Sequence, residues 1–161
     1  MTEAEDFQED APQGALSPPM NRMVIALLAL VGLFVALYLW AHNAGLTGPL
    51  VCGVGDCGTV QSSPYAKIGP VPVSAIGVVG YLALMGLSFA GIQPSQRDSR
   101  VIGGLLLGGA TFGVLFSGYL TYLEAAVINA WCQYCVASAI IMTAIFVATI
   151  PEAFRLRGGG V

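Results

Sequence analysis

Four long stretches without a charged side chain limit what this chain can fold into. They cover residues 23–41, 71–93, 101–123 and 132–150. An α-helix rises about 1.5 Å per residue, so about 20 residues cross the roughly 30 Å hydrocarbon core of a bilayer, and each stretch is about that long. Helices are required there because unpaired backbone groups in lipid are costly. The sequence therefore predicts an all-α membrane protein, a bundle of four transmembrane helices.

The composition excludes the ordinary water-soluble classes. Of the 161 residues, 56% are hydrophobic and only 9% are charged, whereas a soluble domain carries about 25% charged residues. Five of the nine acidic residues lie in the first ten positions, so we expect residues 1–21 to form a disordered acidic tail. Basic residues are not clustered anywhere, so no nucleic-acid partner is expected.

The few basic residues predict how the helices are oriented. Five of the six would share one side of the membrane, namely Arg22, Arg97, Arg100, Arg155 and Arg157, and only Lys67 would lie on the other. The positive-inside rule then places both termini in the cytoplasm and the 42–70 segment outside. A cleaved signal peptide competes for the first stretch. The acidic residues ahead of it and the lack of a cleavage site after it favour a retained helix.

All four cysteines fall on the predicted outer face. Cys52 and Cys57 lie in the first outward loop, in CGVGDC, and Cys132 and Cys135 form CQYC at the start of the fourth helix. Disulfides persist on the outer, oxidising side of a membrane. A helix N-terminus favours a thiolate, and a thiolate attacks another disulfide through a mixed disulfide. The two pairs are therefore predicted to pass electrons from a soluble protein into the bilayer.

The spacing of the cysteines leaves three other interpretations open. Two purely structural disulfides would use the same residues. A zinc site with four cysteine ligands is compatible with the CxxC spacing, although a site at the level of the lipid is a poor place for it. Inert buried thiols are the third alternative. The tight ring of a CxxC disulfide favours the redox interpretation, and we expect no metal.

Two segments resemble the vitamin K epoxide reductase family. They are CGTVQSSPYAKIGPVPVSAIGVVGYLAL from Cys57 onward and GYLTYLEAAVINAWCQYC at residues 118–135. The loop pair before the second helix and the CxxC that opens the fourth are also similar to bacterial members. The resemblance covers about residues 23–150. It implies an enzyme that oxidises the dithiol of a thioredoxin-like protein and passes the electrons to a quinone, ubiquinone or menaquinone.

The resemblance also implies a role for five residues. Cys52 would exchange with the partner protein, and Cys57 would pair transiently with Cys132. Cys135 would face the quinone ring. Ser63 matches a loop serine of the family that is expected to form a hydrogen bond near the quinone. Without the family, Ser63 is an ordinary turn serine.

Two positions depart from the animal enzyme of that family. Val73 stands where that enzyme has an asparagine, and Ala139 stands where it has a tyrosine. Both polar groups contribute to vitamin K binding in the animal enzyme. We therefore expect simple quinone reduction rather than epoxide reduction.

Three aromatic residues lie near the outer end of the third stretch, namely Tyr119, Tyr122 and Trp131. They are candidates to stack against a quinone headgroup. Aromatic residues also collect at membrane interfaces for reasons unrelated to ligands, so the pattern fits an interfacial belt equally well.

Three ionisable residues near the outer face are also candidates. Glu124 lies about one turn beyond the hydrocarbon core, so we expect a solvated carboxylate there, with a proton route to the quinone as the alternative. His42 is the only histidine and is expected at the interface rather than in a ligand set. Asp56, beside Cys57, is interpreted as a turn-forming residue.

The sequence thus predicts three regions and one function. A cytoplasmic tail at 1–21 precedes a four-helix domain at 22–151, whose outward loop between the first two helices serves as a lid, and a second tail follows at 152–161. The predicted protein is a dithiol:quinone oxidoreductase of a bacterial inner membrane that supports disulfide formation. The chain leaves no room for a thioredoxin-like domain, so we expect that partner to be separate. The alternative function is a non-enzymatic membrane scaffold with two structural disulfides.

Overall fold

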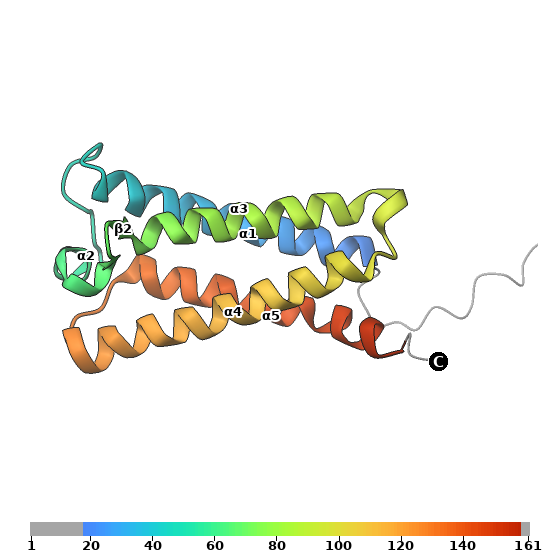
Figure 1. Ribbon diagram of the computed structural model, residues 1–161. Helices are drawn as coiled ribbons and strands as arrows, with labels where there is room; N and C mark the ends of the chain where they lie inside the picture. The colour runs from blue at the N-terminus through green and yellow to red at the C-terminus, as the bar shows by residue number, and fades with distance from the viewer. Residues whose placement is uncertain (1–17, 159–161) are drawn as a thin grey trace, which may run out of the picture.

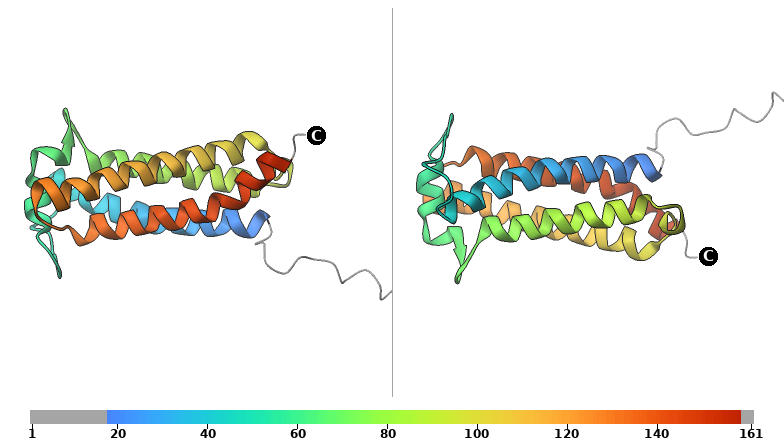
Figure 2. Two further views of the ribbon diagram at one scale, coloured as in Figure 1. Left: turned by 90° about the horizontal axis from the view of Figure 1, so that it is seen from below. Right: turned by 90° about the horizontal axis from the view of Figure 1, so that it is seen from above.

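Four long helices form a bundle that is closed at one end by a small lid (Figures 1 and 2). The computed structural model describes residues 18–158. The long helices are α1 (Pro18–Asn43), α3 (Val73–Ile92), α4 (Arg100–Leu123) and α5 (Gln133–Gly158). Each is long and apolar enough to cross a membrane. The predicted all-α fold with four membrane helices is confirmed.

The lid comprises residues 44–72, between α1 and α3. It contains the short helix α2 (Cys57–Ser62), the 3₁₀ turn η1 (Pro64–Ala66) and the strands β1 (Lys67–Ile68) and β2 (Val71–Pro72), which pair antiparallel. Helix α2 begins after Asp56 because its carboxylate accepts a hydrogen bond from the backbone N–H of Thr59 at 3.0 Å. Asp56, interpreted from the sequence as a turn-forming residue, thus serves as the N-cap of α2.

Small residues allow the long helices to approach one another closely. Gly32 of α1 faces the ring of Tyr81 on α3, and a Cβ atom at this position would overlap that ring. Gly113 of α4 faces Met142 of α5 in the same way. Aliphatic side chains from all four helices fill the rest of the core, which includes Ile25, Leu33, Leu84, Ile102, Leu106 and Ile145. Small residues at such contacts let membrane helices pack closely.

A buried ion pair joins the helices at the end opposite the lid. Arg22 of α1 is only 1% exposed. Its Nε donates to Glu152 Oε1 of α5 at 2.9 Å, and its Nη1 donates to the carbonyl of Gly91 at the end of α3 at 2.6 Å. Gly103 of α4 packs against the same carboxylate, where a Cβ atom would lie 2.9 Å from Oε2. One charged pair therefore contacts all four long helices.

The helices run beyond two of the boundaries expected from the sequence. Helix α1 begins at Pro18 rather than at residue 22, and α5 continues through Pro151 to Gly158, into the segment expected to be a tail. The expected boundaries assumed that charge ends a membrane helix. Arg22 and Glu152 instead neutralise each other inside the bundle, so the helices continue past them. The rest of both expected tails, 1–17 and 159–161, lies outside the described residues.

Removal of one partner of the buried pair should destabilise the bundle. Loss of one partner from a buried ion pair leaves an uncompensated charge and costs about 3–5 kcal/mol. We expect Glu152→Gln to lower the thermal unfolding midpoint clearly in detergent micelles. Asp98→Asn is the matched control, because Asp98 forms its ion pair with Arg155 on an almost fully exposed side chain and should change the midpoint little. Equal midpoints for Glu152→Gln and the wild-type protein would contradict this role of the pair.

Candidate active site

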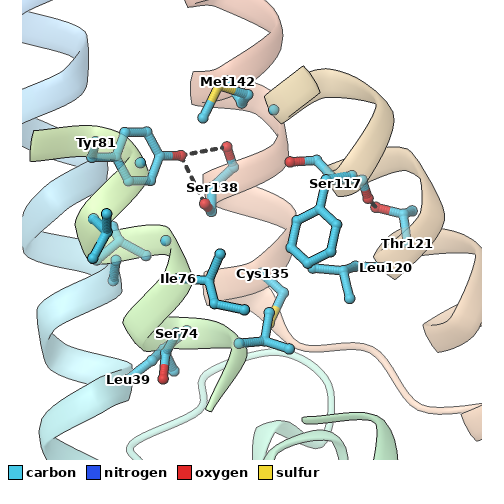
Figure 3. A pocket seen from close by; sticks show the side chains of 18 of the residues that line it. Leu39, Ser74, Ile76, Tyr81, Ser117, Leu120, Thr121, Cys135, Ser138 and Met142 are labelled. Carbon is cyan, nitrogen blue, oxygen red and sulfur yellow. Dashed lines mark hydrogen bonds between the residues drawn. The ribbon is translucent and has the colours of Figure 1, made fainter. Parts of the chain in front are cut away.

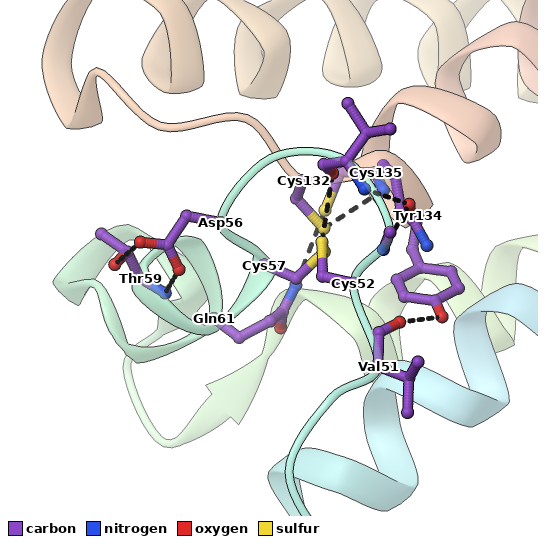
Figure 4. Close-up of a disulfide and its surroundings, with 12 residues drawn as sticks. Val51, Cys52, Asp56, Cys57, Thr59, Gln61, Cys132, Tyr134 and Cys135 are labelled. Atoms are coloured by element: carbon purple, nitrogen blue, oxygen red, sulfur yellow. Dashed lines mark hydrogen bonds between the residues drawn. A yellow bond between two sulfur atoms is a disulfide. The ribbon is translucent and has the colours of Figure 1, made fainter.

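The four cysteines meet where the lid rests on the start of α5 (Figure 4). Cys52 and Cys57 form a disulfide, whereas Cys132 and Cys135 are free thiols. Cys57 and Cys132 are both 0% exposed and belong to one small cluster, against which the two other cysteines pack. The lid pair and the CxxC pair are therefore neighbours, which electron transfer between them would require.

Backbone contacts hold the lid against the segment ahead of α5. The N–H of Asp56 donates to the carbonyl of Trp131 at 2.8 Å, and Gly55 pairs with Cys132 as an isolated antiparallel bridge. Gly55 has a φ of +88°, and a Cβ atom there would collide with the Trp131 carbonyl oxygen. Only glycine combines this backbone angle with this close approach. The residues just before Cys57 are thus held beside Cys132.

Cys132 lies immediately before the first turn of α5, where it takes the place of a capping residue. Its Sγ accepts a hydrogen bond from the backbone N–H of Cys135 at 3.4 Å. A hydrogen bond with the Cys135 side chain lowers the pKa of the Cys132 thiol to about 7, and the backbone N–H groups of Cys135 and Tyr134 act in the same direction. The predicted environment of a thiolate at a helix N-terminus is present at this cysteine.

Glu124 lies beside the CxxC pair and is not solvated. It opens a π-helical turn, η3 (Glu124–Ile128), which follows α4 and ends at Asn129 in the left-handed conformation. This turn folds the chain back under the lid, so Glu124 is only 3% exposed. Its Oε2 accepts the N–H of Cys132 at 3.2 Å, and its carboxyl also interacts with the Cys135 thiol. The expectation of a solvated interfacial carboxylate was therefore wrong.

A cavity of about 400 Å³ extends from the lid past Cys135 into the bundle, mainly between α3 and α4 (Figure 3). Its wall is largely apolar. Its polar residues, besides Cys135, are Gln61, Ser63, Tyr65, Ser74, Tyr81, Ser117, Thr121, Glu124 and Ser138. A hydrogen bond of 2.8 Å joins the Tyr81 hydroxyl to Ser138 Oγ on one side of the cavity. Pockets for small organic molecules have this character, an apolar wall of roughly 300–1,000 Å³ with a few polar groups.

Gln61 of α2 is a site residue that the sequence analysis missed. Its Nε2 donates to Cys135 Sγ at 3.5 Å, and its Oε1 accepts from Asn43 Nδ2 at 2.9 Å. The same Asn43 amide also reaches Ser74 Oγ at 3.3 Å. The contact with Asn43 fixes which end of the Gln61 amide faces the sulfur. Two sequence signals could have found them, since Asn43 follows the end of the first apolar stretch by two residues and Gln61 lies about one helical turn after Cys57.

Ser63, the loop serine singled out by the family resemblance, lies at the wall of the cavity. Its hydroxyl donates to the carbonyl of Val60 at 2.7 Å and so ends α2. Ser63 therefore forms a local turn and also lines the cavity.

The three aromatic candidates are not brought to this cavity. Tyr119, Tyr122 and Trp131 are 55%, 62% and 49% exposed, and none of them lines the cavity beside Cys135. The expectation that they stack against a quinone there does not fit the structure, because α4 turns Ser117, Leu120 and Thr121 toward the cavity instead. Exposed aromatic rings at the end of a membrane helix fit an interfacial belt.

Neither His42 nor the acidic residues form a metal site in the described part of the chain. His42 Nδ1 lies 3.1 Å from the carbonyl oxygen of Gly48 in the lid. Within residues 18–158, no group of three or more His, Cys, Asp or Glu side chains is placed to hold a metal ion.

A helical membrane bundle that holds a disulfide against a CxxC pair has the features of a membrane thiol–disulfide oxidoreductase. The family model of the vitamin K epoxide reductase family matches residues 23–150, a span that contains all four cysteines and the cavity. The chain belongs to the vitamin K epoxide reductase family. Membership confirms the resemblance drawn from the sequence and indicates an oxidoreductase, in a family whose members generally use quinones.

The contact between the CxxC thiols predicts the titration of Cys132. In the reduced protein we expect the Cys132 thiolate to form with a midpoint near pH 7, measured by ultraviolet thiolate absorbance. Cys135→Ala removes the hydrogen bond and should move the midpoint upward, toward the ordinary value of 9.0. Cys135→Ser keeps a donor and should hold the midpoint lower than the alanine variant does. Identical midpoints in the two variants would contradict the assigned cause.

Proposed function

We propose that this protein transfers two electrons from a reduced thioredoxin-like protein to a membrane quinone. The lid pair receives the electrons, the CxxC pair takes them from the lid, and the quinone takes them from the CxxC pair. The observation that carries the proposal is the order of the four sulfurs. Cys52 is partly exposed, Cys57 and Cys132 are buried side by side, and Cys135 opens onto the cavity.

The first step takes place at the partly exposed end of the lid disulfide. A thiolate of the partner attacks Cys52, the Cys52–Cys57 bond breaks, and Cys57 leaves as a thiolate. The second thiol of the partner then displaces Cys52, so the partner becomes a disulfide and the lid pair becomes a dithiol. Cys57 is fully buried, which supports Cys52 as the sulfur that is attacked.

The second step moves the electrons between the pairs. The Cys57 thiolate attacks Cys132 in a Cys132–Cys135 disulfide, and Cys135 leaves. Cys52 then attacks Cys57, which restores the lid disulfide and releases Cys132 as a thiolate. The lowered pKa of Cys132 makes it a good leaving group. The arrangement in the structure, an oxidised lid pair beside two free CxxC thiols, corresponds to the end of this step.

The cavity beside Cys135 fits a quinone as the acceptor. A quinone takes up two electrons and two protons and leaves as a quinol. The apolar wall suits its ring and tail, and the exposed Val79 of α3 and Phe112 of α4 at the rim suit access from the lipid. The Gln61 amide, held by Asn43, donates a hydrogen bond in the cavity beside Cys135. Glu124, whose carboxyl interacts with the Cys135 thiol, is the ionisable group placed to exchange a proton there.

The orientation that we propose places the lid outside a bacterial inner membrane. The end opposite the lid carries five arginines, whereas the lid carries one lysine, Lys67. This asymmetry supports a cytoplasmic position for the arginine-rich end. The partner would then meet the lid in the oxidising compartment, where disulfide formation takes place. A purely structural scaffold is less well supported, because Cys132 and Cys135 are free thiols.

A cross-linking experiment tests the contact between the pairs. In the double variant Cys52→Ser/Cys135→Ser, only Cys57 and Cys132 remain, and we expect them to form a disulfide under mild oxidation. The matched control is Cys57→Ser/Cys132→Ser, whose remaining sulfurs lie at the partly exposed end of the lid pair and at the cavity, and which should cross-link more slowly. Peptide mapping without reduction identifies the bond. A faster bond in the control would contradict the proposed order of the sulfurs.

Anaerobic mixing of the reduced protein with quinones tests whether a quinone is the electron acceptor. The reduced protein should reduce short-tailed ubiquinone or menaquinone analogues, followed by the change in quinone absorbance. Gln61→Leu removes one hydrogen bond beside Cys135 and should slow the reaction by about tenfold. Ser62→Ala is the matched control, because this exposed hydroxyl bonds only the carbonyl of Thr59 in α2. Failure of the wild-type protein to reduce every analogue would overturn the proposed acceptor.

A further inference from the structure

The two residues between the cysteines of CQYC both contact the lid segment that carries Cys52. Gln133 Oε1 accepts the N–H groups of Gly53 and Val54, each at 3.0 Å. The Tyr134 hydroxyl donates to the carbonyl of Val51 at 2.6 Å. These hydrogen bonds bracket Cys52 on both sides, and Figure 4 shows the tyrosine contact beside the disulfide.

A second tyrosine supports the Tyr134 contact. The rings of Tyr38 on α1 and Tyr134 on α5 pack with their centroids 5.2 Å apart. The Tyr38 hydroxyl also accepts the N–H of Val51 at 3.5 Å. Both backbone polar groups of Val51 are therefore bound by the bundle, one by α1 and one by α5.

These contacts replace the backbone partners that the lid segment lacks. Residues 51–54 belong to neither a helix nor a strand, so their N–H groups have no ladder to join. A side-chain carbonyl oxygen has two lone pairs and can accept two neighbouring N–H groups, as Gln133 does here. The position of Cys52 relative to α5 thus depends on the side chains of the CxxC spacer, in addition to the bridge at Gly55.

We propose that Gln133 and Tyr134 are positioning residues that clasp the Cys52 segment and keep the lid pair aligned with Cys132. The inference rests on the proposed electron relay and adds to it a control of the exchange between the pairs. With the clasp closed, Cys52 stays next to Cys57 and can complete the transfer by attacking it. In that step the Cys57–Cys132 bond breaks, the Cys52–Cys57 bond forms, and Cys132 leaves as a thiolate that holds the electron pair.

Loss of the clasp should affect the two half-reactions in opposite directions. A freed Cys52 segment exposes the lid disulfide, so a soluble dithiol reduces it faster. The same freedom moves Cys52 away from Cys57, so electrons pass more slowly from the lid to the CxxC pair. A contact that does not hold the Cys52 segment would change neither half-reaction when it is removed, and this distinguishes the clasp from a merely structural contact.

Hydrogen exchange measures the clasp directly in the full chain in detergent micelles. We expect Gln133→Leu to speed exchange at Gly53 and Val54 by about tenfold, because their N–H groups lose their acceptor. Gln133→Glu keeps an acceptor oxygen and should restore slow exchange. Gln93→Leu, at the exposed end of α3, is the matched control and should leave the lid unchanged. Equal exchange in Gln133→Leu and the wild-type protein would overturn the clasp.

A single-turnover experiment measures how the clasp affects electron transfer from the lid pair to the CxxC pair. The fully oxidised protein is mixed with one equivalent of dithiothreitol, quenched with acid at intervals and alkylated, and mass spectrometry locates the thiols. In Gln133→Leu and Tyr134→Phe we expect faster reduction of Cys52–Cys57 and about tenfold slower appearance of thiols at Cys132 and Cys135. Tyr122→Phe, an exposed tyrosine on α4, is the control for Tyr134→Phe and should match the wild type.

The outcomes separate this inference from the proposed function. If the wild-type protein never passes thiols from the lid pair to the CxxC pair, the relay itself fails. If the wild type passes them and the Gln133 and Tyr134 variants do so at the same rate, the relay stands and the clasp is wrong. Slowing of both half-reactions in the variants would also overturn the clasp, since release of the Cys52 segment should make reduction of the lid disulfide faster.

Discussion

The close approach of the lid backbone to the residues ahead of α5 is the contact on which the site depends. Gly55 pairs with Cys132, and the N–H of Asp56 bonds the Trp131 carbonyl. Cys57 and Cys132, which lie far apart in the sequence, thereby share one buried cluster. The four membrane helices supply the frame, but without this backbone contact the lid disulfide would have no fixed position relative to the CxxC pair. Thiol–disulfide exchange between the pairs needs this fixed position, because a thiolate must reach the disulfide that it attacks.

The fold could be predicted from the sequence to a large extent because lipid leaves few alternatives. An uncharged stretch of about 20 residues has to be a helix when it crosses a bilayer, so the four helices followed from length alone. The ends of α1 and α5 could not be predicted, since Arg22 and Glu152 look like charges that end a helix until their pairing across 130 positions is known. The four cysteines could likewise be singled out from the sequence. Their contact with one another could not be predicted, because it depends on how the lid folds.

The polar residues around the cysteines show where prediction from sequence stops. Glu124 was expected in solvent because a regular helix would have carried it past the membrane, and the π-helical turn at Glu124–Ile128 was not visible in the sequence. Gln61 is one of several polar residues in the lid, and only its contacts with Asn43 and Cys135 distinguish it. Tyr119 and Tyr122 illustrate the opposite error, since a residue type suited to a ring ligand was present on a helix surface that faces elsewhere.

The complete burial of Cys132 beneath the lid limits which thiols can react with it. In the proposed relay, a small soluble thiol could reach only the partly exposed Cys52 of the lid disulfide and would have no direct route to reduce Cys132. In that relay, electrons from soluble thiols could enter the protein only through Cys52. A protein built in this way can stay selective for its physiological donor even where low-molecular-weight thiols are abundant.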